Sequence, residues 1–129
     1  MYEKYINRMY FYGKNDCASL SVEFLRNELN LDIKDFPRKS LFQFPNYLHD
    51  CCIENDFIDI DDIDNMDLQF GDVIICKLKN NLPIHLLIYI KDNLVLTIAP
   101  FKMSNLYPLE EEIKINPVVH HMRHKSQFK

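Results

Sequence analysis

A cysteine stands at the start of an expected helix, in the stretch "FYGKNDCASLSVEFLRNEL" that covers residues 11–29. Asn15 or Asp16 can serve as the helix N-cap, which places Cys17 in the first turn. Unpaired backbone N–H groups and the positive end of the helix dipole stabilise an anion there. Such a position can lower the pKa of a thiol and allow a nucleophilic role, while a small buried cysteine that fills a gap is the plainer alternative.

A thiolate nucleophile needs a base within reach, and His85 is the best placed of the five histidines. In "PIHLLIYI", residues 83–90, strand alternation puts His85 on one face with Leu87 and Tyr89. A titratable ring at the start of an apolar strand indicates either a histidine bonded to a neighbouring loop or the imidazole partner of Cys17. From these residues alone, both interpretations stay open.

Helices are expected before the strands that would position His85. Apolar spacing indicates a short helix at 2–10, a helix from Asp16 to Leu29, and a helix at 40–54 that Pro45 disturbs. The acidic stretch 54–72 is expected to be a surface connection.

Strands follow, and they are expected at 72–78, 84–90 and 94–99, with one or two more in 112–124. Tight turns between them predict an antiparallel meander. This order predicts an α+β fold with helices packed on one face of an antiparallel sheet.

Length and composition indicate a single globular domain over residues 1–129, with 47% hydrophobic residues and a net charge of −4. The negative charge argues against a nucleic-acid partner, and the absence of a long apolar run argues against a membrane partner. The N-terminus lacks the apolar region of a secretory signal, so synthesis in the cytoplasm without export by the general secretory route is expected. The four cysteines show no CxxC spacing, which disfavours a disulfide framework and a zinc ribbon.

Two segments resemble the NlpC-type cysteine peptidases, which are papain-like cell-wall hydrolases, and in particular their short versions from phage tails. "YGKNDCASLSVEFL" is similar to the nucleophile segment, where an aromatic-Gly pair precedes an Asp-Cys that opens a helix. "FGDVIICKLKNNLPIHLLIYIKDNLVLTIAP" is similar to the second half, where Gly-Asp precedes a core strand and a histidine opens the next. The resemblance runs from Tyr12 to Pro100.

This resemblance implies a papain-like fold in which Cys17 is the nucleophile and His85 the general base. It places Tyr12 beside the cleft and Asp16 next to the nucleophile, with core packing and helix capping as their respective alternatives. It implies a peptidoglycan stem peptide as substrate, no metal or other cofactor, and a place in the virion with other tail or tail-tip proteins as partners.

Thr97 departs from the family pattern, because the family usually has a histidine there that orients the base. A short neutral hydroxyl would hold the imidazole tautomer less firmly. Two functions therefore remain: a cysteine peptidase or amidase with a Cys–His dyad, and a structural tail-tip component with little or no activity. A thiol-dependent acyl transferase on the same scaffold is a third.

Other possible ligand residues have plainer interpretations. Cys51, Cys52 and Cys76 are expected to be small buried hydrophobic residues. The aspartates of the acidic stretch lack the glycine of a calcium loop and are expected to be solvated; they are Asp59, Asp61, Asp62 and Asp64. His120 and His124 could share a helix face and bind a metal, but a strand and an exposed tail are expected instead.

Overall fold

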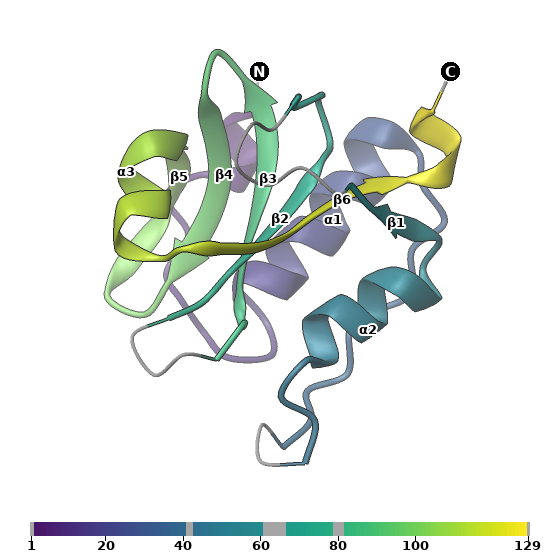
Figure 1. Ribbon diagram of the computed structural model, residues 1–129. Coiled ribbons are helices and arrows are strands. Elements are labelled where there is room, and N and C mark those ends of the chain that lie inside the picture. Colours follow the sequence, from purple (N-terminus) through teal and green to yellow (C-terminus); the bar gives the residue numbers. More distant parts are fainter. Residues whose placement is uncertain (1, 41–42, 61–66, 79–81, 129) are drawn as a thin grey trace.

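Six antiparallel strands form one sheet in the computed structural model, which describes residues 2–40, 43–60, 67–78 and 82–128. The order across the sheet is β1-β6-β2-β3-β4-β5 (Figure 1). The α+β class and the antiparallel meander are therefore confirmed. The bounds are β1 Phe57–Asp59, β2 Val73–Cys76, β3 His85–Lys91, β4 Leu94–Ala99, β5 Lys102–Pro108 and β6 Val118–His124.

Helices cover both faces of this sheet, and not one face as expected. In Figure 1, α1 passes behind the central strands and α3 lies on the other side. The core divides accordingly, since Phe24 of α1 packs with Leu86 and Ile88, whereas Leu109 of α3 packs with Leu87. The helices are η1 Glu3–Tyr5, α1 Cys17–Leu29, α2 Tyr47–Glu54, α3 Leu109–Ile115 and η2 Lys125–Gln127.

This double cover explains the apolar runs in the central strands. Every residue of β2 is buried, because its side chains meet α1 on one face and α3 on the other. The alternation expected in β3 is confirmed, since Leu86 and Ile88 enter one cluster and Leu87 the other. His85 therefore begins β3 on the face that α3 covers.

The helix at the nucleophile segment forms as the sequence predicts. Asp16 is the N-cap, and its side chain accepts a hydrogen bond from the Ser19 backbone N–H. The helix ends at Leu29, where Asn30 adopts a left-handed conformation with φ 55° and donates its N–H to the Leu25 carbonyl.

The helix expected at 2–10 is wrong beyond the short η1. Asn7 has φ 61°, which interrupts any helix there. Its N–H donates to the Ser104 carbonyl at 2.6 Å, and Ser104 donates its own N–H to the Arg8 carbonyl at 2.9 Å. The segment therefore pairs with β5, a contact that its apolar spacing does not reveal.

The middle of the chain also differs from expectation. The helix predicted at 40–54 begins only at Tyr47, two residues after Pro45, while residues 41–42 lie outside the described part. The acidic stretch contains β1, which pairs with β6 and buries Phe57. Within that stretch, residues 61–66, and with them the expectation for Asp61, Asp62 and Asp64, are outside the described residues.

The last third holds one missed strand and one misassigned segment. β5 is an edge strand with mostly exposed or half-buried side chains, so its sequence lacks an apolar run. The strand expected near residue 112 is the helix α3, which buries Leu109 and Glu112 at a helical spacing of three. The strand expected after it is confirmed as β6.

Candidate active site

Cys17 is the first residue of α1, and the loop before it is held by Asp16. One Asp16 carboxylate oxygen accepts the Ser19 N–H at 2.9 Å, and the other accepts the Gly13 N–H at 2.8 Å. Gly13 has φ +85°, a conformation that glycine adopts without strain. The helix-capping alternative for Asp16 is therefore confirmed, and the cap fixes the backbone that presents the thiol.

Arg38 completes this support, and the sequence analysis did not identify it. Its Nε donates to Asp16 Oδ2 at 2.7 Å, and its Nη2 donates to Ser19 Oγ at 2.6 Å and also to Asp16 Oδ1. Burial by itself would raise the pKa of Asp16, but hydrogen bonds from Arg38, Ser19 and Gly13 outweigh it and hold the pKa below its usual value. A charged arginine therefore lies just beneath the start of the helix.

The Cys17 thiol lies against the backbone on both sides of His85. Its Sγ donates to the Ile84 carbonyl at 3.5 Å. Burial raises the pKa of the thiol to about 11, and a hydrogen bond from the Leu86 backbone N–H opposes this rise without cancelling it. The expected lowered pKa is thus wrong for the resting structure, because desolvation outweighs the helix terminus.

His85 is 4% exposed and stands directly opposite Cys76 in the β2–β3 pair. Burial lowers its pKa, the carboxylate of Glu112 raises it, and the ammonium of Lys102 lowers it again. The net shift is downward, which favours the neutral imidazole that a general base requires. Among the hydrogen bonds between described residues, none joins the His85 ring to the Cys17 thiol.

Thr97 lies on β4, where its hydroxyl donates to the Leu86 carbonyl at 2.9 Å. The hydroxyl proton is therefore used by the strand backbone one residue after His85. Its oxygen keeps a lone pair that can accept from imidazole, but the hydrogen bonds found between described residues do not include that contact. Thr97 thus secures the β3 backbone beside the candidate base.

A small pocket of about 60 Å³ opens over the thiol. Three of the residues around it are tyrosines, and Tyr12 among them is 57% exposed. The described residues that line it do not include His85, so the structure brings Cys17, Asp16 and Tyr12 together at this opening and places His85 on the other face of the sheet. The lining residues are Tyr10, Tyr12, Asp16, Cys17, Ala18, Tyr47 and Ile84.

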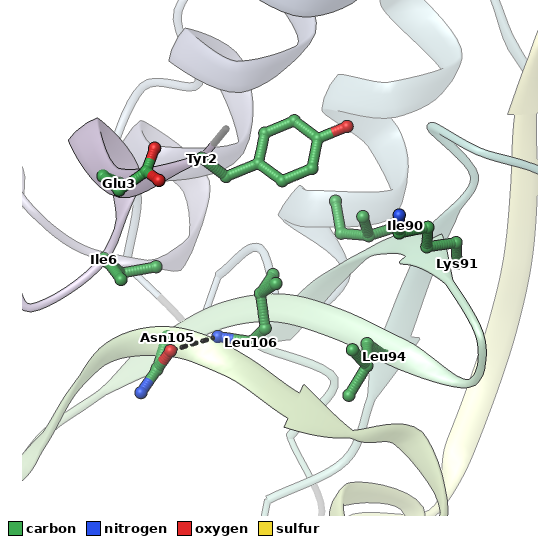
Figure 2. A pocket seen from close by; sticks show the side chains of 8 residues that line it. All are labelled: Tyr2, Glu3, Ile6, Ile90, Lys91, Leu94, Asn105 and Leu106. Atoms are coloured by element: carbon green, nitrogen blue, oxygen red, sulfur yellow. Dashed lines mark hydrogen bonds between the residues drawn. The ribbon is translucent and has the colours of Figure 1, made fainter.

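A separate pocket of about 250 Å³ lies between the N-terminal segment and the strands β3 to β5. Figure 2 shows Ile90, Leu94 and Leu106 lining it, with the ring of Tyr2 alongside. The Asn105 side-chain oxygen accepts the Leu106 N–H at 2.8 Å. The pocket contains no histidine or cysteine among the described residues that line it, so it offers no nucleophile.

The remaining cysteines behave as expected for structural residues. Cys51, Cys52 and Cys76 are free and buried, and burial raises the pKa of each thiol. His120 and His124 lie on β6, which confirms a strand in place of a shared helix face.

Comparisons with protein-family models, with curated proteins and with solved structures found no significant match. The described helices are each too short or too polar to cross a membrane. The function of this chain is therefore inferred from the residues of the site.

Alkylation of Cys17 by iodoacetamide should accelerate about tenfold for each pH unit between pH 7 and 10. The reason is that the thiolate fraction of a group with pKa about 11 grows tenfold per unit in this range. The measurement is the rate of modification of the Cys17 peptide by mass spectrometry. A free cysteine, with a pKa of about 8.5, levels off above about pH 9 and is the control. A Cys17 rate that is already constant at pH 7 would show a preformed thiolate.

Proposed function

We propose that this chain is a papain-like cysteine peptidase or amidase of the NlpC type, with Cys17 as nucleophile and His85 as general base. The observation that carries the proposal is the position of the thiol, which contacts the Ile84 carbonyl immediately before His85. The N-terminus of α1, its capped loop and the backbone on either side of His85 come together there, although they lie far apart in sequence.

In the proposed reaction, the Cys17 sulfur attacks the carbonyl carbon of an amide while the thiol proton passes to His85, whose ring has to turn from the α3 face of the sheet toward the thiol. The backbone N–H of Cys17, at the start of α1, stabilises the oxyanion of the tetrahedral intermediate. His85 then returns the proton to the leaving amine as the C–N bond breaks. Water, deprotonated by the same imidazole, attacks the thioester and releases the acid with the free thiol.

The raised pKa of Cys17 decides how the thiol is activated. A thiol with a pKa of about 11 is protonated near neutral pH, so the proton must leave during attack and not before it. A neutral His85 suits that step, because burial lowers its pKa. The dyad we propose therefore works by general-base catalysis and not through a resting thiolate–imidazolium pair.

A peptide substrate fits the surface around the thiol. Tyr10 lines the pocket over Cys17 and also a larger one of about 470 Å³, so the two adjoin. The larger pocket is bordered by Met9, Phe101 and Met103, which are 75%, 108% and 49% exposed. Together with the resemblance, this supports a peptidoglycan stem peptide as substrate and a phage tail tip as the setting, where other tail proteins are the partners.

A second candidate is a structural tail-tip component with the same papain-like fold and no turnover. Two observations favour it: the pKa of Cys17 is raised, and the Thr97 hydroxyl donates to the Leu86 carbonyl. Both leave the nucleophile and the base without the polarisation typical of an efficient Cys–His pair.

Incubation with purified peptidoglycan separates the two functions. We expect wild type to release peptides with new amino termini, and Cys17→Ala to release only background amounts, detected by amine labelling and mass spectrometry. Cys51→Ala is the matched control and should retain wild-type release, because Cys51 lies on α2 outside the pocket. If wild type releases no more than Cys17→Ala, the peptidase fails and the structural function is favoured.

A further inference from the structure

Two histidines and an aspartate meet at the edge of the sheet where β1 pairs with β6. His49 comes from α2, Asp59 ends β1 and His120 lies on β6. One potential ligand atom from each side chain lies within 4.8 Å of the other two. Among the described residues, no other set of three histidine, cysteine or carboxylate side chains is this close.

The carboxylate of Asp59 connects the two rings. His49 Nε2 lies 2.9 Å from Asp59 Oδ2 and 3.1 Å from Oδ1, and His120 Nδ1 lies 3.5 Å from Oδ1. The two imidazoles stack, with centroids 3.9 Å apart and planes inclined at 20°. Neighbouring ligands of a tetrahedral zinc ion with bonds of about 2.0–2.1 Å are about 3.4 Å apart, close to these separations.

The charges in the cluster also suit a cation. Two stacked imidazoles repel each other when both are protonated, while Asp59 attracts either one in its charged form. Each imidazole ring can supply a nitrogen lone pair and the carboxylate can supply oxygens, so the cluster combines two nitrogen donors with one oxygen donor.

We propose that His49, Asp59 and His120 bind one divalent transition-metal ion, and that Zn²⁺ is the ion that fits best. Imidazole nitrogens together with one carboxylate oxygen form a donor set that zinc accepts in proteins. The Asp59 side chain is 43% exposed, which leaves room for a water molecule at the fourth position. The rings turn out of their stack so that both lone pairs point at the ion.

This site is separate from the Cys17 pocket, because no residue lines both. Its three ligands join α2 to the edge strand β1 and to its neighbour β6, so a bound ion would fasten this edge of the sheet. β1 has only three residues and pairs with β6 alone. Metal binding at this site is independent of the peptidase function, so a negative result for one leaves the other unaffected.

Titration of the full chain, prepared without a histidine tag and freed of metal by chelation, tests this site. We expect one equivalent of Zn²⁺ to bind in calorimetry and to raise Tm. Co²⁺ should give visible absorption bands without the near-ultraviolet sulfur-to-cobalt band that cysteine ligation produces. Binding should weaken steeply as pH falls below about 6, because protons compete for the imidazoles.

Asp59→Asn and His120→Gln should each reduce the affinity at least tenfold, because each removes one of three ligands. His124→Gln is the matched control on the same strand and should bind as wild type does, since His124 contacts Ser126 and not the cluster. Circular dichroism confirms that each variant is folded, and in wild type Zn²⁺ should shift the ring NMR signals of His49 and His120. Unchanged affinity in Asp59→Asn, no binding by wild type, or a sulfur-to-cobalt band would each overturn the proposal.

Discussion

Replacing Asp16 by alanine is expected to lower the free energy of unfolding by about 3–5 kcal/mol, the loss typical of breaking a buried ion pair. The variant would leave the Arg38 guanidinium without its carboxylate and would orphan the N–H groups of Gly13 and Ser19. The Asp16 and Arg38 side chains are 5% and 17% exposed, so water replaces these contacts poorly. Urea unfolding followed by circular dichroism measures the change.

Two comparisons show whether the charge pair or the cap dominates. Asp16→Asn keeps a capping oxygen and should lose less than Asp16→Ala, because a neutral asparagine is an equally good N-cap. The double variant Asp16→Ala/Arg38→Met should lose less than the sum of the single variants, since it removes the unpaired charge. Additivity within about 0.5 kcal/mol would show that the two side chains do not stabilise each other.

An exposed ion pair provides the control for surface charge in general. The Arg26 Nη2 and Asp35 Oδ1 atoms lie 3.2 Å apart, and the two side chains are 42% and 86% exposed, respectively. Asp35→Ala should therefore cost at most about 1 kcal/mol. If Asp35→Ala lowers the free energy of unfolding as much as Asp16→Ala does, burial of the Asp16–Arg38 pair does not explain the large loss in Asp16→Ala.

Asp72→Asn is expected to lower the free energy of unfolding by a similar amount, about 3–5 kcal/mol. Asp72 directly precedes β2, at the end of the central strands that lies away from Cys17. The Asp72 side chain is 1% exposed, and its oxygens accept two hydrogen bonds from Arg123 at 2.8 Å each. His121 Nε2 lies 2.7 Å from the same carboxylate, and the Gln69 N–H donates to it at 3.0 Å. Neutralising this carboxylate leaves a nearly buried arginine without a counter-charge.

Lowering the pH should also reveal how much the ionised Asp72 carboxylate contributes to stability. Burial would raise the pKa of Asp72, but hydrogen bonds from Arg123, His121 and Gln69 outweigh it and the net pKa is lowered. A carboxyl with a lower pKa in the folded chain contributes its full stability above the unfolded value of about 3.9 and loses it as pH falls. Wild type should therefore lose stability between about pH 5 and pH 2, and Asp72→Asn should show a shallower fall. Parallel curves for the two proteins would refute this role.

The buried Asp72 cluster also has a signal in the sequence that could have been used. Gly71 and Asp72 precede β2 in the Gly-Asp pair that contributed to the resemblance. Gly71 has φ +88°, a conformation that favours glycine, and a Cβ there would lie 2.3 Å from Leu29 Cδ2 and would displace that side chain. The acid follows the turn directly, but its partners His121 and Arg123 are about fifty residues away and no local pattern links them.

What the sequence determined by itself is local. Asp16 as N-cap, the extent of α1 and the facing of His85 and Leu87 follow from residues within one helical turn or from strand alternation, and all three are confirmed. Local patterns misled where another segment competed, as at Asn7, which pairs with β5, and at Glu112, whose helix resembles a strand in its apolar spacing.

Tertiary structure alone decided the electrostatics of the site. The Arg38–Asp16 pair spans twenty-two residues, and the cluster of His49, Asp59 and His120 joins three separate elements. Burial reverses the effect of the helix terminus on Cys17, because the cost of desolvating a thiolate depends on the packing of distant segments around it. The sequence thus placed Cys17 at the start of a helix and His85 at the start of a strand, and long-range packing set the pKa values and the partners of both side chains.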